Sequence, residues 1–129
     1  MKKPEKNFTF PQSASVIKYI RKKYTTEPEF LWKKFPRYAI WRYEKNNKWY
    51  GVIMSIPRIK LGLSGDDMIE ILDLRIDTNE IPLAIDNKHY FPGWHMNKNH
   101  WITIILDGSV ALSEIYHRID NSYQITTNK

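Results

Sequence analysis

Cationic, amide and imidazole side chains gather at several predicted turns of this sequence, and they are its residues best suited to a chemical task. Lysine and arginine neutralise phosphates, while asparagine and histidine can hydrogen-bond to phosphates or bases. The candidate contact residues are Arg42, Lys48, Arg58, Lys60, Asn97, Lys98 and His100. Tryptophans accompany them at positions 41, 49, 94 and 101. The pattern predicts a nucleic-acid interface. The alternative interpretation is an aromatic core beneath a solvated cationic surface.

The charge of the 129-residue chain is distributed unevenly along its length. Residues 1–50 contain 13 Lys/Arg and 4 Asp/Glu, a net charge of +9, whereas residues 51–129 contain 7 and 10, a net charge of −3. The two values sum to the +6 of the whole chain. A basic half suits a polyanionic partner, because phosphate neutralisation releases counterions. A lysine-rich soluble surface would give the same count.

Composition and motifs exclude or disfavour several kinds of chemistry. Cysteine is absent, which removes disulfides, thiolate metal sites and cysteine nucleophiles. The GxSxG pattern is missing, and the glycine-containing loop Pro57–Gly65 matches neither the GxGxxG nor the GK[ST] phosphate-binding pattern. The adjacent carboxylates Asp66 and Asp67 are typical of a solvated turn. We therefore predict a non-enzymatic protein without a cofactor.

Four histidines are the remaining candidate metal ligands: His89, His95, His100 and His117. His95 and His100 could face each other across a predicted turn, but no carboxylate lies between them and HExxH is absent. We predict no metal site and a hydrogen-bonding role at a hairpin tip.

No apolar run approaches the roughly 18 residues of a membrane span. The N-terminus lacks the apolar stretch of a signal peptide, so we expect a cytoplasmic protein without membrane contact.

Helices are predicted at both ends of the chain, to frame these turns. After a lead-in over residues 1–10, apolar residues recur at helical spacing within Pro11–Tyr24, with Ser13 as the expected N-cap. The connection Thr25–Pro36 is rich in aromatic residues, so we predict a short helical turn that packs onto the core. A second amphipathic helix is expected over Leu112–Tyr123.

Strands are predicted in the middle of the chain. Tyr38–Tyr43 and Trp49–Ile56 are β-rich runs around an Asn-Asn turn, which indicates a hairpin. Strict alternation gives the second run two faces, one with Tyr50, Val52, Met54 and Ile56 and the other with Trp49, Gly51, Ile53 and Ser55. Both faces are partly apolar, so this strand is expected inside the sheet. Met68–Ile76 is predicted as a third strand.

The next segment is predicted to form a short helix. Asp77 and Glu80 resemble a capping box, whereas Pro82 favours a helix that starts closer to the proline itself. Tyr90–Trp94 is predicted as a turn.

A further hairpin is predicted around Asn97–Asn99. His95–Met96 would begin or pair with a strand, and Trp101–Leu106 is the most apolar run and the expected central strand. The whole chain, residues 1–129, is therefore expected to form one α+β domain. Its antiparallel β-sheet would have helices packed on one face.

Three blocks of the sequence together resemble the MmcQ/YjbR family of small bacterial proteins. They read KFPRYAIWRYEKNNKWYGVIMSIPRIKLGLSGDD, YFPGWHMNKNHWITIILDGSV and IDNSY, and the likeness runs from Glu29 to the C-terminus. Val16–Trp32 resembles a helical extension of some members, so 11–32 is interpreted in that way. The resemblance implies a CyaY-like fold and DNA binding through a double wing of β-hairpins. It also implies that Arg58, Lys60, Asn97, Lys98 and His100 are the matching positions.

The same likeness to CyaY and frataxin implies a rival function, iron binding by an acidic first helix. The corresponding segment Pro11–Tyr24 departs from that pattern, because it contains four Lys/Arg and no Asp or Glu. This departure disfavours iron and favours an anionic partner.

The function expected from the sequence is therefore salt-sensitive, weakly sequence-specific DNA binding through phosphate contacts at hairpin tips. The alternative is a protein- or small-ligand-binding module that uses an aromatic surface around Trp94 and Tyr90. A contiguous exposed apolar patch would favour that alternative, and a deep pocket with convergent titratable groups would favour an enzyme.

Overall fold

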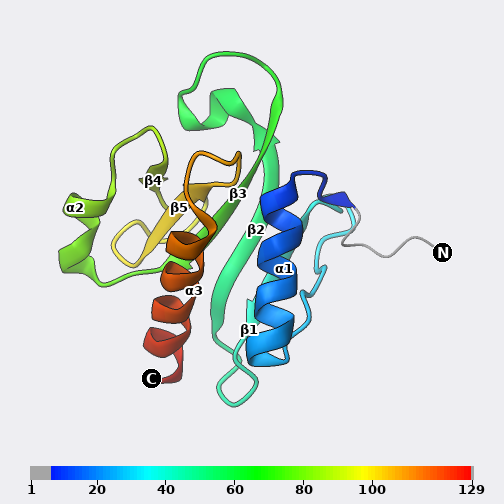
Figure 1. Ribbon diagram of the computed structural model, residues 1–129, viewed down its shortest axis with the longest axis vertical. Coiled ribbons are helices and arrows are strands. Elements are labelled where there is room, and N and C mark those ends of the chain that lie inside the picture. Colours follow the sequence, from blue (N-terminus) through cyan, green and yellow to red (C-terminus); the bar gives the residue numbers. More distant parts are fainter. Residues whose placement is uncertain (1–6, 129) are drawn as a thin grey trace.

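Residues 7–128, which the computed structural model describes, form an antiparallel sheet with two long helices on one face (Figure 1). The helices are α1 (Pro11–Tyr24), α2 (Ile81–Ala84) and α3 (Leu112–Thr127), with 3-10 turns η2 (Arg58–Leu61) and η3 (Thr78–Glu80). The strands are β1 (Tyr38–Arg42), β2 (Trp49–Pro57), β3 (Met68–Arg75), β4 (Tyr90–Pro92) and β5 (Trp101–Ile105). Their order is β1-β2-β3-β5-β4. The predicted α+β class is confirmed. Residues 1–6 of the predicted lead-in lie outside the described residues.

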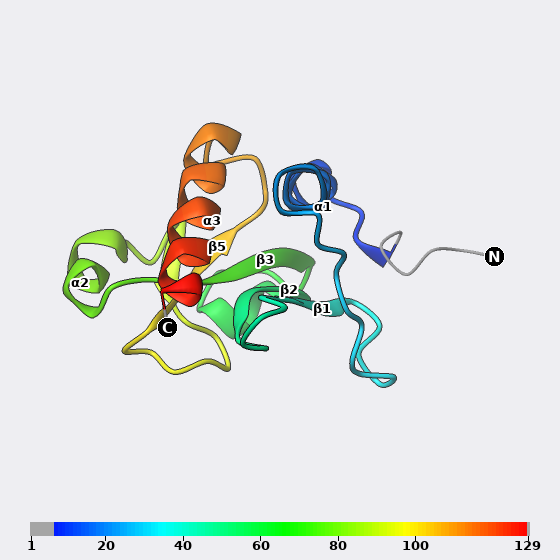
Figure 2. The ribbon, with the colours of Figure 1, turned by 90° about the horizontal axis from the view of Figure 1, so that it is seen from below.

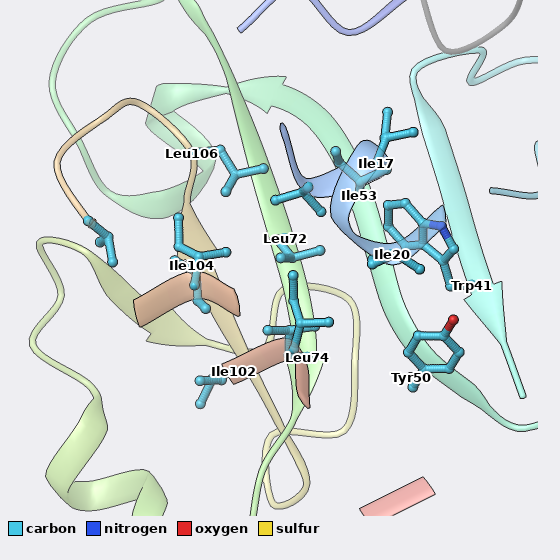
Figure 3. Close-up of a cluster of buried hydrophobic side chains, with 14 of the residues drawn as sticks. Ile17, Ile20, Trp41, Tyr50, Ile53, Leu72, Leu74, Ile102, Ile104 and Leu106 are labelled. Atoms are coloured by element: carbon cyan, nitrogen blue, oxygen red, sulfur yellow. The ribbon is translucent and has the colours of Figure 1, made fainter. Parts of the chain in front are cut away.

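Both long helices cover the same side of the sheet (Figure 2). The apolar stripe of α1, with Val16, Ile17 and Ile20, packs with α3 and with inward side chains of the strands (Figure 3). Trp41 is fully buried in this layer. A Cβ at Gly51 would lie 3.1 Å from the Trp41 ring, so glycine makes room for the indole. We call this side the helix-covered face.

The start of α1 differs from the predicted cap. Phe10 is the N-cap residue, and Ser13 is buried within the first turn with an unpartnered Oγ. The backbone N–H groups that lead into the helix donate instead to Glu70 of β3, from Thr9 at 2.8 Å and from Phe10 at 3.0 Å. A distant carboxylate thus holds the two residues that precede the helix, which a local pattern cannot reveal, and the helix has no side-chain cap.

Three predictions for the region from β3 to β5 are wrong. Asp77 forms no side-chain cap bond, and the helix begins at Ile81, next to Pro82, as the alternative prediction had it. Tyr90–Pro92 is a strand rather than a turn, because it pairs with β5. A proline is tolerated there because β4 is the edge strand. β5 is interior, but the central strand is β3.

The connection between α1 and β1 is also not helical. Glu29 and Ile40 exchange two backbone hydrogen bonds, at 2.8 and 3.0 Å, which ties the connection to the outer edge of β1. Isolated turns follow, closed by bonds from Phe35 N–H to Trp32 C=O and from Tyr38 N–H to Phe35 C=O. The connection therefore passes the sheet edge and reaches the side opposite the helices (Figure 2).

Candidate nucleic-acid interface

Among residues 7–128, no α-helix covers the second face of the sheet, and we call it the helix-free face, although Leu61 of the 3-10 turn η2 and Leu63 pack against it. Side chains of all five strands bury apolar surface there, including Ile40, Val52, Ile71, Phe91 and Ile105. Loops, rather than helices, pack over this layer. The connection 28–37 and the loop 93–100 lie on this side in Figure 2. Both segments contribute side chains to the aromatic groove of this face.

A β-bulge determines which aromatic side chain of β2 reaches this face. Trp41 pairs with Gly51 and Arg42 pairs with Trp49, so Tyr50 is the extra residue of β2. Strict alternation was therefore wrong at this point. Tyr50 packs in the helix-covered core, whereas Trp49 packs with Val52 on the helix-free face. An inserted residue reverses the alternation on one side of the bulge.

An aromatic groove of about 380 Å³ lies on the helix-free face. Val52 and Met54 of β2 line it, together with Trp49, with Tyr38 of β1, with Trp32 and Phe35 of the connection, and with His95 and Met96 of the loop 93–100. The Trp32 ring is nearly perpendicular to the rings of Tyr38 and Trp49, with interplanar angles of 76° and 88°. Phe35 stacks on Tyr38 with centroids 4.8 Å apart and remains 48% exposed.

The loop 93–100 is held close against β5. A Cβ on Gly93 would lie 2.8 Å from the Trp101 Cβ and 2.9 Å from the Trp101 carbonyl oxygen, so only glycine allows this approach. The Trp94 N–H donates to Thr103 Oγ1 at 2.8 Å, and Lys98 Nζ donates to the Gly93 carbonyl at 3.0 Å. These contacts fix the loop wall of the groove.

A buried carboxyl group lies in the sheet near this loop. Asp73 is fully buried; its Oδ1 accepts a 2.5 Å hydrogen bond from Thr103, and its Oδ2 has no partner. Burial raises the pKa of Asp73 well above its usual value, against the smaller opposing effects of the Thr103 bond and of Lys98. The carboxyl is therefore biased towards its neutral form.

The stretches next to the groove contain cations and no carboxylates, because Glu29 of the connection lies outside them and pairs with Arg42. Residues 31–38, 48–57 and 93–106 include no Asp or Glu. Their exposed cations are Lys33, Lys34, Arg37, Lys48 and Lys98. In the part of the chain that the structure describes, none of these five forms an ion pair. A further cation, Arg75, stacks over Trp101 and donates to the Trp49 carbonyl at 2.6 Å.

The predicted contact residues divide between the two ends of the sheet. Lys48 in the β1–β2 turn and Asn97, Lys98 and His100 in the β4–β5 loop lie at the end where β3 finishes, and all four are exposed. Arg42 lies at this end too, but its Nε donates to Glu29 at 2.9 Å.

Arg58 and Lys60 lie at the opposite end, in η2 (Figure 1). Arg58 donates to the Ser64 carbonyl at 3.2 Å. The same loop contains Asp66 and Asp67, so its cations and carboxylates are equal in number.

Sequence reasoning missed the connection as a part of the site. Trp32 does pack down as predicted, but Leu31 and Phe35 remain about half exposed, at 46% and 48%, and Lys34 and Arg37 flank them. The signal was available in the run WKKFPR, which combines two aromatic rings, three cations and a proline. Its assignment to a packed helical turn concealed it.

The histidines are not gathered. His95 lies against the Trp94 ring, with centroids 3.8 Å apart, and has a left-handed backbone at φ 61°. His89 pairs with Asp86 at 3.2 Å. Among residues 7–128, no three His, Asp or Glu side chains lie close enough to hold a metal ion.

A second cleft, of about 490 Å³, lies between α1 and α3 on the helix-covered face. Its main polar group, Asp120, accepts hydrogen bonds from Tyr19 at 2.8 Å and Tyr24 at 2.5 Å, and pairs with Lys23 at 2.9 Å. Burial opposes ionisation, but these bonds lower the pKa of Asp120 below its usual value. Because its partners are already supplied by the chain, this cleft offers little to a ligand.

These features define a class: a small α+β protein whose sheet has one structural face and one basic, aromatic face. The chain belongs to the YjbR family, whose sequence model matches residues 21–125. It is 39% identical over 111 residues to the uncharacterized protein YyaQ of Bacillus subtilis, covering 86% of this chain and 94% of that protein. It is 51% identical over 37 residues to the uncharacterized protein YjbR of Escherichia coli, covering 29% and 31%.

A solved structure supports the same fold. A crystal structure of a Pseudomonas syringae protein superimposes with a TM-score of 0.85 at 39% identity, covering 88% of this chain and 97% of that one.

Within residues 7–128, no helix combines the length and apolarity needed to cross a bilayer.

Proposed function

We propose that this protein binds nucleic acid, with DNA as the first partner to test, through the helix-free face of its sheet. The observation that carries the proposal is the charge of the three segments around the groove. They present five exposed cations without a carboxylate and without an ion pair among the described residues. Cations that no internal partner neutralises are available to phosphates.

The proposed contacts differ between the two ends of the sheet. Lys48 and Lys98, with Asn97 and His100 beside them, would contact phosphates together with the newly identified Lys34. The contribution of Arg58 and Lys60 would be smaller, because Asp66 and Asp67 lie in the same loop and repel phosphate. Arg42 would contribute least, since Glu29 already neutralises it.

Binding of this kind depends steeply on salt. Each neutralised phosphate of duplex DNA contributes a slope of about −0.9 to a plot of log affinity against log salt. Five contacts would therefore give a slope of about −4.5. Sequence preference would be weak, because phosphate contacts carry no base information.

The absence of a catalytic arrangement in the groove supports binding rather than chemistry. The residues that line it include no carboxylate and no lysine. Asp73 is buried, and among the described residues its carboxyl accepts a hydrogen bond from the Thr103 hydroxyl alone. A small-ligand or protein partner remains the second candidate, favoured by the half-exposed Phe35 at the groove. Its location differs from the surface expected around Tyr90, whose ring is buried and whose hydroxyl donates to Glu114.

The test is the affinity for a labelled random DNA duplex over a salt series from about 50 to 200 mM. We expect the double variant Lys34→Glu/Arg37→Glu to weaken binding and to reduce the salt slope by about 2. The matched control is Lys18→Glu/Lys22→Glu on the exposed side of α1, which changes the net charge equally. Equal weakening by both variants would show a general effect of charge and contradict the assigned face.

A further inference from the structure

We infer that the aromatic groove holds an unpaired base of a single-stranded nucleic acid, with the Phe35 ring as its outer stacking surface. The inference rests on the proposed function and goes beyond it, because phosphate contacts alone do not distinguish single strands from duplexes. The groove adds contacts that only an unstacked base can make.

The geometry of Phe35 provides the first step. One face of its ring lies on Tyr38, with an interplanar angle of 13°, while the side chain remains 48% exposed. Tyr38 is the one aromatic ring that contacts Phe35 in the described part of the chain, so we take the opposite face of the ring as the stacking surface offered to a base. The Trp32 ring is nearly perpendicular to two neighbouring rings, at 76° to Tyr38 and 88° to Trp49. These four rings form one aromatic cluster, with the half-exposed Phe35 at its outer edge.

The size and lining of the groove provide the second step. Its volume of about 380 Å³ lies at the low end of the roughly 300–1,000 Å³ range of small-molecule pockets. It suits one or two aromatic rings rather than a helix of a partner protein. Val52, Met54 and Met96 give it an apolar lining. Because every base has a π-face and few polar groups are available to read it, recognition would tolerate many sequences.

The surrounding charges provide the third step. Lys34 and Arg37 line a shallow cleft that shares Phe35 and Tyr38 with the groove, so they lie beside its outer edge. Lys98 lies in the loop that forms the opposite wall. A polyanionic backbone crossing the groove would meet cations on both sides and no exposed carboxylate within the three segments.

An extended acidic peptide fits this surface less well. A peptide that adds a strand needs a free sheet edge, but Ile40 at the outer edge of β1 already exchanges both backbone bonds with Glu29. At the other edge, Pro92 of β4 has no N–H to donate. The occupant must therefore bind by ring stacking and charge rather than by backbone pairing.

The experiment measures the affinities of an oligothymidylate of about ten nucleotides and of a duplex of equal length. It uses the full chain, Phe35→Ala, Phe35→Trp and the control Leu83→Ala, whose side chain is 89% exposed on α2. We expect Phe35→Ala to weaken single-strand binding about five- to hundredfold. Phe35→Trp should restore it, the control should leave it unchanged, and duplex binding should change less than about twofold.

Each contrary outcome identifies what has failed. If Phe35→Ala leaves single-strand affinity unchanged, or weakens both partners equally, the groove inference is wrong while phosphate binding stands. If neither partner binds at low salt, the proposed function is wrong as well. If a polyglutamate peptide displaces the oligothymidylate at equal charge concentration, the surface recognises anions in general and the base has no role. Circular dichroism of each variant confirms that it is folded.

Discussion

The two faces of the sheet treat their polar and aromatic groups in opposite ways. On the helix-covered face, Lys23 pairs with Asp120 and the hydroxyls of Tyr19 and Tyr24 donate to the same carboxylate. On the helix-free face, exposed cations have no ion partner among the described residues, and Phe35 is half exposed. On the first face, the polar groups around Asp120 are satisfied internally, although the buried Ser13 Oγ, Trp41 Nε1 and Tyr50 hydroxyl have no hydrogen-bond partner among the described residues. The second leaves its interactions available to a partner.

The comparison explains why burial alone does not locate the site. Both faces bury a full apolar layer on the strands, and both have fully buried isoleucines, such as Ile53 on one and Ile56 on the other. The difference lies in what covers them. Helices α1 and α3 close the first face, with Lys23 of α1 paired to Asp120 of α3, whereas the connection 28–37 and the loop 93–100 cover the second only in part.

Loss of core packing should give the largest contrast between the faces. Trp41 is fully buried under the helices, so Trp41→Ala should lower the free energy of unfolding by about 3–5 kcal/mol. Phe35→Ala on the other face should lower it by less than about 1 kcal/mol, because half of that side chain is already exposed. Urea denaturation measures both. Equal losses would mean that Phe35 serves stability, and the division between the faces would be lost.

The carboxyl groups of Asp73 and Asp120 should affect the pH dependence of stability in opposite directions. Burial raises the folded pKa of Asp73, so the folded state binds more protons than the unfolded state above the ordinary aspartate pKa of about 4. This contribution therefore lowers stability as the pH rises from about 4 to the folded pKa. Asp73→Asn should remove this pH dependence, so the variant should gain stability relative to the parent protein as the pH rises. A difference independent of pH would contradict the assignment.

Ionisation of Asp120 should change the free energy of unfolding in the opposite direction and by less. Its folded pKa is lowered, so its stabilisation is present above pH 4 and is lost as the pH falls towards the folded value. Asp120→Asn should cost about 1–2 kcal/mol at neutral pH, the usual loss when charge-assisted hydrogen bonds are weakened. The cost should vanish in acid. Thermal unfolding at several pH values measures it, and a cost that persists at low pH would show that ionisation is unimportant there.

Much of the fold could be predicted because its signals are local. The spacing of Val16, Ile17 and Ile20 gave α1 its observed bounds, and the Asn-Asn turn gave the β1–β2 hairpin. The bulge at Tyr50 could not be seen, since one unpaired residue leaves no mark on the pattern but changes which side chains share a face. The hydrogen bonds from Thr9 and Phe10 to Glu70, which hold the start of α1, could not be seen either, because the partners are separated by about 60 positions.

The candidate site was predicted only in part, for a reason of topology. In an antiparallel sheet, the turn before β2 and the loop after it lie at opposite ends, so Lys48 and Arg58 could not share one surface at a single end. Strand order alone would have separated them. The role of Lys34 depends on the path of the connection, which the Glu29–Ile40 bridge fixes through backbone contacts that side-chain patterns do not encode.

The most direct test of the division between the faces uses the five tryptophans as reporters. Their indole N–H signals in a nitrogen–proton NMR spectrum would be followed while a single-stranded oligonucleotide is added. Trp32 and Trp49 line the groove, whereas Trp41 is buried beneath the helices. We predict that the signals of Trp32 and Trp49 shift in a saturable way while that of Trp41 stays in place. Saturable shifts confined to Trp41 and to the amides of α1 and α3 would place the partner on the helix-covered face and contradict this prediction.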